Sequence, residues 1–423
     1  MPKHMTISEK ILACKSSSNY VSPGEIVYCN VDIAMSHDNT ALVIKNFQDI
    51  GIKNVWDPSK IVIPLDHRIP ANQIETAEAH KTIRKFVKMQ KIENFFDMRQ
   101  GICHQVLPEH GFILPGELII GTDSHSTTYG ALGAFGTGVG ASEMAGIWAT
   151  GEIWLRVPET IKIIINGKLS NGVYAKDVIL KIISELTASK ANYKTIEFYG
   201  ETIKRFSISE RMTLCNMTIE MGAKTGIVPP DKNTTNYLRN RSKKTFRNIY
   251  SDKDAQFIEE VTFDFSKLEP QVAFPHAVDN VKDISEASGI KIEQAFVGSC
   301  TNGRLDDLKA VGDLLTGRTV HPDVRLLVCP ASVEVYLNAL KAGIIEKIIR
   351  AGGVVLNPGC GPCLGAHQGV LAAGEVAISS SNRNFRGRMG SPEAEVYLAS
   401  PATVTASAIK GEITNPNIML GSN

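Results

Sequence analysis

A regular succession of short apolar runs in the last third of the chain limits the possible folds more than any other feature. These runs begin at residues 295, 324, 353 and 376, and residues 333–342 have the spacing of an amphipathic helix. The starts of these runs are 29, 29 and 23 residues apart. Buried strands that recur at such intervals with helices between them are typical of parallel sheets. The sequence therefore predicts an α/β protein with a parallel sheet in this region.

The first third has the same organisation. Residues 61–65 and 117–120 are predicted strands, and helices are predicted over residues 75–94, 140–155 and 175–187. The strands run into the polar motifs LDHRIP and GTDSHST, and those of the last third run into GSCTNGR, NPGCGPCLG and SSSNRNFRGR. Ligands bind beyond the carboxyl ends of the strands in open parallel sheets. We therefore expect Cys300, Cys360, Cys363, Arg383 and Arg388 to converge.

Composition excludes several classes of protein. The 423 residues predict more than one domain, and 45 basic against 44 acidic residues leave a net charge of +1, which argues against a nucleic-acid-binding protein. The basic run within residues 233–248 is interpreted as part of an exposed surface segment, a solvated helix face. Eight cysteines are too few for a disulfide scaffold, and the N-terminus has no apolar run typical of a signal peptide. A cytoplasmic enzyme is the expectation.

Three cysteines mark a candidate metal site. Cys360 and Cys363 form a C-x-x-C in a Pro/Gly loop, and Cys300 follows a predicted strand. The pair alone fits a zinc half-site, a redox dithiol or part of an iron–sulfur site. Zinc usually takes four ligands, whereas three converging thiolates suit an iron–sulfur cluster with one iron that has no cysteine. Three buried structural cysteines are the remaining alternative.

Acidic and imidazole side chains follow the predicted strands of the first third. An Asp beside a His can fix the tautomer of the ring and raise its pKa, which makes the ring a proton donor to a leaving hydroxyl. Arg383 and Arg388 carry planar guanidinium groups that suit an anionic substrate with several carboxylates. The alternatives are capping carboxylates, structural histidines and surface ion pairs. The candidates at these strand ends are Asp66, His67, His104, Asp123, Ser124 and His125, and Glu220 is a candidate for the hydrogen-bond network around metal-bound water.

The glycine-rich stretch GAFGTGVGASE, which begins at Gly133, raises the question of a nucleotide site. Its spacing does not match the G-x-G-x-x-G of dinucleotide-binding loops, and the chain has no phosphate-binding G-x-x-x-x-G-K-[ST]. We interpret it as a site of close helix packing.

Taken in order, these motifs resemble those of the aconitase family of hydro-lyases. The matching motifs are LDHRIP, GICHQ, GTDSHST, CNMTIEMGA, GSCTNGR, GCGPCLG and SNRNFRGR, which span residues 66–388. The resemblance implies three α/β/α domains, placed at residues 1–160, 161–275 and 276–423. It also implies a 4Fe–4S cluster held by Cys300, Cys360 and Cys363, with one iron lacking a cysteine ligand.

The resemblance assigns roles to individual residues as well. The implied catalytic residues are Asp66, His67, His104, Asp123, His125 and Glu220. The implied substrate-binding residues are His37, Ser124, Asn216, Asn382, Arg383 and Arg388.

Two departures from single-chain aconitases refine the expectation. Those enzymes have Gln–Asp where this chain has His37–Asp38, which resembles the branch of the family that isomerises 2- and 3-isopropylmalate in leucine biosynthesis. The alternatives are the conversion of homocitrate to homoisocitrate and hydration of small methylmalate-type acids. Single-chain members also continue into a mobile fourth domain with a serine base. We therefore expect a separate small subunit to carry that domain and the base.

Two other classes of function stay open. Some aconitases act as RNA-binding regulators, and a zinc-binding structural protein would also use clustered cysteines. Metal analysis separates these alternatives, because iron with acid-labile sulfide supports the hydro-lyase and zinc supports the structural protein.

Overall fold

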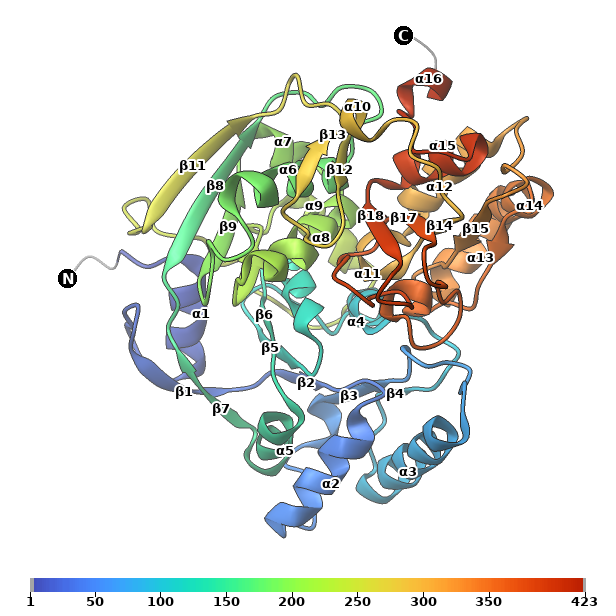
Figure 1. Cartoon of the computed structure of the whole chain (residues 1–423). Helices are drawn as coiled ribbons and strands as arrows, with labels where there is room; N and C mark the ends of the chain where they lie inside the picture. The colour runs from blue at the N-terminus through green and yellow to red at the C-terminus, as the bar shows by residue number, and fades with distance from the viewer. Residues whose placement is uncertain (1–3, 421–423) are drawn as a thin grey trace.

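A computed structural model describes residues 4–420, and its strands form four sheets (Figure 1). Strands β1 (Ile26–Asn30) and β7 (Glu152–Arg156) pair as an antiparallel ribbon. A five-stranded parallel sheet has the order β4-β3-β2-β5-β6. Its strands are β2 (Ile33–Met35), β3 (Ile61–Pro64), β4 (Phe95–Phe96), β5 (Leu118–Gly121) and β6 (Phe135–Gly138).

The other two sheets follow in sequence. A four-stranded parallel sheet has the order β10-β9-β8-β11, and a seven-stranded sheet has the order β13-β12-β18-β17-β14-β15-β16. In the latter, strands β18 to β16 run parallel, and β12 and β13 add antiparallel pairs at one edge. Their strands are β8 (Thr160–Asn166), β9 (Thr195–Tyr199), β10 (Thr225–Ile227), β11 (Glu259–Asp264), β12 (Gln271–Ala273), β13 (Val281–Asp283), β14 (Gln294–Val297), β15 (Arg325–Val328), β16 (Val354–Val355), β17 (Val376–Ser379) and β18 (Glu395–Leu398).

Helices connect the strands and pack on the sheets. The α-helices are α1 (Ile7–Lys15), α2 (Thr40–Ile50), α3 (Ile74–Gln90), α4 (Cys103–Glu109), α5 (Ala141–Thr150), α6 (Ala175–Leu186), α7 (Glu201–Arg205), α8 (Ile208–Met217), α9 (Lys232–Arg239), α10 (Ile284–Ala287), α11 (Ser299–Asn302), α12 (Leu305–Leu315), α13 (Val333–Lys341), α14 (Ile344–Arg350), α15 (Pro401–Lys410) and α16 (Asn417–Leu420). None of those in the described part of the chain is long and apolar enough to cross a membrane.

The predicted α/β class and parallel sheets are confirmed. Apolar runs at all six predicted positions form strands, because buried parallel strands need side chains that are apolar on both faces. The three sheets other than the ribbon lie within residues 33–138, 160–264 and 271–398, and they meet around the centre of the molecule (Figure 1). The domain boundaries at residues 160 and 275 stay a prediction.

Three local predictions are wrong or only partly right. The predicted helix over residues 140–155 ends at Thr150, because Gly151 has a φ of 78° and residues 152–156 form β7. The basic run after α9 is not a helix face: the helix ends at Arg239, and Phe246 packs against the core. The glycine stretch includes β6 rather than a packed helix, and a Cβ at Gly136 would lie 2.3 Å from the Ser126 carbonyl oxygen. The close packing is therefore that of a strand against a short 3-10 helix.

Candidate active site

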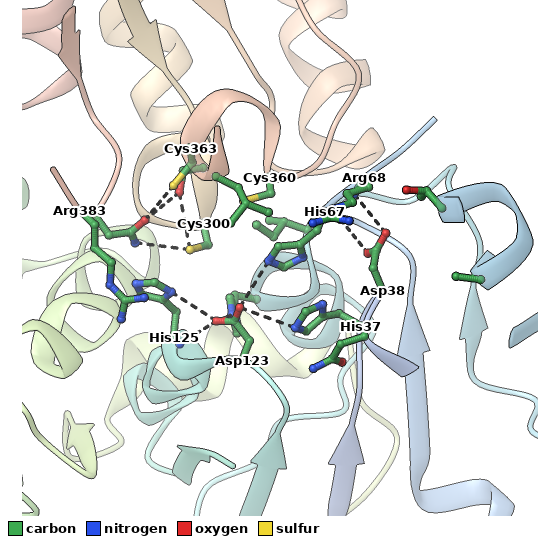
Figure 2. Close-up of a pocket in the computed structure, with 18 of the residues that line it drawn as sticks. His37, Asp38, His67, Arg68, Asp123, His125, Cys300, Cys360, Cys363 and Arg383 are labelled. Atoms are coloured by element: carbon green, nitrogen blue, oxygen red, sulfur yellow. Dashed lines mark hydrogen bonds and ion pairs between the residues drawn. The ribbon is translucent and has the colours of Figure 1, made fainter. Parts of the chain in front are cut away.

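A cavity of about 440 Å³ lies where loops from the five-stranded and seven-stranded sheets meet (Figure 2). His37 follows β2, His67 follows β3 and Asp123 follows β5, all at the carboxyl ends of parallel strands. Cys300 lies in α11 after β14, and Arg383 lies beyond β17. The topology thus brings residues that are far apart in the sequence to one place, as the positions of the motifs predicted.

Most of the predicted site residues line this cavity. They are His37, His67, His104, Asp123, His125, Cys300, Cys360, Cys363, Asn382, Arg383 and Arg388. Asp66, Asn216 and Glu220 are not among the lining residues but hydrogen-bond to residues that are. Ser124 lines a neighbouring cavity and accepts a hydrogen bond from Arg383 Nη2 at 3.1 Å.

The three predicted ligand cysteines lie together in the cavity wall (Figure 2). Cys300, Cys360 and Cys363 are 5%, 5% and 1% exposed, and all three are free thiols. A hydrogen bond from Cys360 and the nearby Arg388 guanidinium hold the pKa of the Cys363 thiol well below its usual range. Arg388 Nη2 donates to Cys363 Sγ at 3.4 Å. The site therefore favours at least one thiolate, the form that binds metals.

Two asparagine side chains support the thiols. Asn216 Nδ2 donates to Cys300 Sγ at 3.1 Å, and Asn382 Nδ2 donates to Asn216 Oδ1 at 2.5 Å and to Cys300 Sγ at 3.5 Å. Asn382 Oδ1 lies 3.4 Å from Cys363 Sγ. Hydrogen bonds to sulfur tune iron–sulfur clusters. The buried thiols with amide and guanidinium donors around them fit a cluster held by three cysteines.

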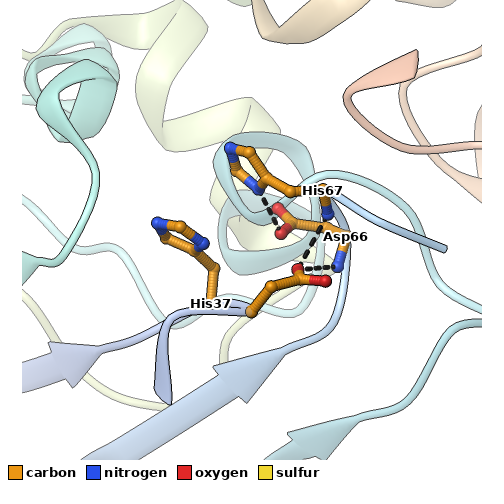
Figure 3. Close-up of side chains that lie close together, drawn as sticks. His37, Asp66 and His67 are labelled. Carbon is orange, nitrogen blue, oxygen red and sulfur yellow. Dashed lines mark hydrogen bonds and ion pairs between the residues drawn. The ribbon is translucent and has the colours of Figure 1, made fainter. Parts of the chain in front are cut away.

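An Asp–His pair faces the thiols across the cavity. His67 Nδ1 lies 2.6 Å from Asp66 Oδ1, and its other ring nitrogen lies 3.4 Å from Asp123 Oδ2 (Figure 3 shows the first contact). Burial disfavours a charged ring, but the negative charges of Asp66 and Asp123 hold the pKa of His67 well above its usual value. His37 stacks on His67 with ring centroids 4.2 Å apart. The site thus favours the protonated form of His67, which can donate a proton.

The Asp123 carboxylate contacts the imidazole rings of several histidines. Its Oδ1 lies 2.9 Å from His104 Nε2 and accepts the His125 backbone N–H at 2.7 Å. Burial opposes its charge, but hydrogen bonds from His104, His125 and His67 hold the pKa of Asp123 well below its ordinary range. Asp123 therefore orients three imidazoles in one site.

Arg383 belongs to a second charged group at the other side of the cavity. Its Nε donates to both carboxylate oxygens of Glu220 at 2.9 and 3.0 Å. Glu220 Oε1 lies 3.0 Å from His125 Nε2. Burial lowers the pKa of His125, but the negative charges of Cys300, Asp123 and Glu220 outweigh it and raise that pKa to about 9. Glu220 therefore orients the guanidinium group rather than lying free in the cavity.

Sequence reasoning missed two residues of the site. Asp38 accepts backbone N–H groups of Asp66, His67 and Arg68 at 2.8, 2.8 and 3.1 Å, so its carboxylate fixes the turn that carries the Asp–His pair. His80 lies in α3 with its Nε2 3.0 Å from Asp38 Oδ1. Asp38 was visible in the sequence as the neighbour of His37, but a histidine inside a helix gave no signal.

The carboxylates and imidazoles of this turn could themselves suggest a metal site. Ligand atoms of His37, Asp38, Asp66 and His67 lie within 4.8 Å of one another. However, Asp38 is already bonded to the backbone of the turn, and Asp66 accepts from His67 and from the Cys103 N–H at 2.7 Å. The group is better explained as a hydrogen-bonded acid pair.

Comparison with known proteins agrees with the fold and the site. Residues 9–411 match the aconitase family (aconitate hydratase), and the chain belongs to that family of hydro-lyases. Proteins of this family typically carry a 4Fe–4S cluster. The chain has the fold of Thermococcus kodakaraensis aconitase X, with a TM-score of 0.50 and 15% identity over 87% of this chain and 88% of that one.

Nearer relatives are known from their sequences. The 3-isopropylmalate dehydratase large subunit 1 of Methanopyrus kandleri is 53% identical over 97% of this chain and 98% of its own length. The probable 3-isopropylmalate dehydratase large subunit of Methanothermobacter thermautotrophicus is 55% identical over 97% and 99%. The probable methanogen homoaconitase large subunit of the same organism is 52% identical over 99% of each chain.

Proposed function

We propose that the chain is the large subunit of a hydro-lyase that interconverts 2- and 3-isopropylmalate by dehydration and rehydration. The observation that carries this proposal is the convergence of three buried thiols, an Asp–His pair and two arginines on one cavity. The choice of isopropylmalate as substrate rests on the names of relatives that are 53% and 55% identical.

The residues divide into functional groups around the substrate. Cys300, Cys360 and Cys363 would hold a 4Fe–4S cluster, and its iron without a cysteine ligand would supply a Lewis acid for a substrate hydroxyl and a carboxylate oxygen. Arg383 and Arg388 would bind substrate carboxylates through their guanidinium groups. Glu220 holds Arg383 in place, as the two hydrogen bonds between them support.

His67 is the proposed proton donor. The substrate C–O bond breaks as His67 delivers its proton to the departing hydroxyl, which leaves as water. Asp66 and Asp123 would stabilise the protonated ring beforehand and fix its orientation. The neighbouring carbon must lose a proton to complete the double bond, and the return of water to that alkene at the other carbon gives the isomer.

We assign the base that takes the carbon-bound proton to a small subunit. The relatives that match over nearly their full length are named large subunits, which supports a second chain. Around the cavity, the carboxylates of Asp66, Asp123 and Glu220 are each engaged with histidine or arginine, so they are poorly suited to abstract this proton. The fourth domain of the family would then belong to that partner.

Homocitrate is the second candidate substrate. It is favoured by the homoaconitase name of a relative that is 52% identical over 99% of the chain. The test is steady-state dehydration of each acid by the cluster-loaded chain with its small subunit, followed by alkene absorbance under anaerobic conditions. We expect the higher kcat/KM for isopropylmalate. A higher value for homocitrate would favour the second candidate, and no turnover of either would refute both.

A further inference from the structure

We propose that the buried ammonium group of Lys176 is the counter-charge for the cluster held by Cys300, Cys360 and Cys363. This inference rests on the proposed function, because it assumes that these thiols hold a cluster. Lys176 lies in the first turn of α6, which contacts α8, β12 and β13, and no sequence motif marks it.

Lys176 is a completely buried cation without a carboxylate partner. Its side chain is 0% exposed, and its Nζ donates to the carbonyl oxygens of Ser380 and Ser381 at 3.0 and 2.5 Å. Within residues 4–420 no carboxylate oxygen lies within 4.0 Å of Lys176 Nζ, which is the limit for an ion pair. The neighbouring Asp177 accepts backbone N–H groups of Tyr174 and Gln271 instead. A buried charge with no partner is unfavourable, so the protonated form of Lys176 needs a negative group nearby.

Cys363 and Cys300 are the groups whose sulfurs, when negatively charged, act most strongly on Lys176. Burial lowers the pKa of Lys176 to about 7, and the charges of Cys363 and Cys300 are the largest influences that raise it again. Glu220 follows them, but that carboxylate is already paired with Arg383. Thiolates that hold a cluster carry negative charge permanently, whereas free thiols do not. A loaded site would therefore supply the compensation that the neighbouring carboxylates do not.

The two carbonyls that Lys176 binds lead directly to a residue of the sulfur site. Ser380 and Ser381 precede Asn382, whose amide contacts Cys300 Sγ and Asn216. Ser380 Oγ also accepts the Gly298 N–H at 3.1 Å, in the turn that enters α11 and Cys300. Lys176 thus joins α6 to the segment after β17, and its charge lies behind the ligands rather than in the substrate cavity, whose lining does not include it.

Two replacements separate the charge from the hydrogen bonds. Lys176→Met has a similar length but neither charge nor donors, whereas Lys176→Gln keeps a donor for the carbonyls and removes the charge. The matched control is Lys181→Met on the same helix, because Lys181 is a partly exposed lysine paired with Glu185 at 2.8 Å. Each full-length chain is purified anaerobically, reconstituted with iron and sulfide, and transferred to a chelator.

The measurements are iron and sulfide content, the rate of iron release, the reduction potential of the cluster, and urea unfolding of the cluster-free chain. Loss of a group behind metal ligands typically lowers metal affinity roughly 10- to 100-fold. We expect the Gln and Met variants to release iron about tenfold or more faster and to have a more negative reduction potential. The cluster-free Gln variant should stay as stable as the parent, whereas the Met variant should be less stable because it leaves two buried carbonyls without a donor. The control should match the parent in every measurement.

Two other outcomes distinguish a failure of the Lys176 proposal from a failure of the proposed function. If the Gln variant holds iron as long as the parent at an unchanged potential, the role of Lys176 is wrong and the proposed function is unaffected. If the parent itself takes up neither iron nor sulfide, both proposals are overturned. Should the Met variant fail to fold, the Gln variant carries the test, because it retains a donor to the buried carbonyls.

Discussion

Replacing Asp66 with Asn tests the proposed proton donor. Asp66 is 0% exposed, and its carboxylate holds His67 Nδ1 at 2.6 Å while it accepts the Cys103 N–H at 2.7 Å. Asn keeps an acceptor for that N–H but turns its amide NH2 toward His67, so the ring loses both the negative charge and the acceptor that favour its protonated form. A hydrogen bond to a charged group contributes about 1.5–3 kcal/mol, and one pKa unit corresponds to about 1.4 kcal/mol. We therefore expect the pKa of His67 to fall by about one to two units.

Because the donor acts in its protonated form, activity is present below the pKa of His67 and is lost as pH rises through it. The alkaline limb of the kcat profile should move to lower pH by about one to two units, so that at pH values above both limits kcat falls about 10- to 100-fold. The assay is isopropylmalate dehydration by the two-subunit enzyme between pH 6 and 10. The control is Asp252→Asn, since Asp252 also accepts one backbone N–H and one cation but lies away from the cavity. An unmoved limb with kcat within threefold of the parent would refute the role of the pair.

Three further predictions concern other parts of the molecule. Cys360→Ser should abolish retention of iron and sulfide, and equal contents in parent and variant would remove Cys360 from the ligand set. Arg383→Lys keeps the charge but loses the planar guanidinium group that contacts Glu220, so transition-state stabilisation should fall by about 2–4 kcal/mol, seen as a lower kcat/KM. A fall in kcat/KM of less than threefold would contradict this role. Burial raises the pKa of Glu109 to about 7, so its folded form loses stability as pH rises from 4.5 to 7. Glu109→Gln should therefore increase the free energy of unfolding by about 1–3 kcal/mol at pH 8 and have little effect at pH 4.5, which urea unfolding measures.

The sequence predicted the parallel sheets and the convergence of Cys300, Cys360 and Cys363 on one cavity, for a physical reason. Buried parallel strands are apolar on both faces, so their positions can be found without the tertiary structure, and their carboxyl ends then place the motifs. Cys300 and Cys363 are 63 residues apart in sequence. Cys300 follows β14 and Cys363 follows β16, and both strands pair in parallel with β15, so their carboxyl ends lie at one edge of the sheet.

The predictions failed where tertiary packing decides the outcome. The helix before β7 ends at Gly151, whose left-handed conformation a pattern of small residues does not reveal. His80 and Lys176 lie in ordinary helical sequence, and only the folded chain buries them against Asp38 and the carbonyls of residues 380–381. Their importance depends on neighbours that are distant in sequence.

The most direct test of the central claim is the dehydration rate of isopropylmalate by the cluster-loaded chain, measured by alkene absorbance with and without the small subunit. A missing positioned base costs roughly 10²- to 10⁴-fold. We predict that the chain alone takes up a 4Fe–4S cluster but turns over at least 100-fold more slowly than the mixture. Equal rates with and without the second chain would contradict the assignment of the base to a partner and would place it among the residues of this cavity.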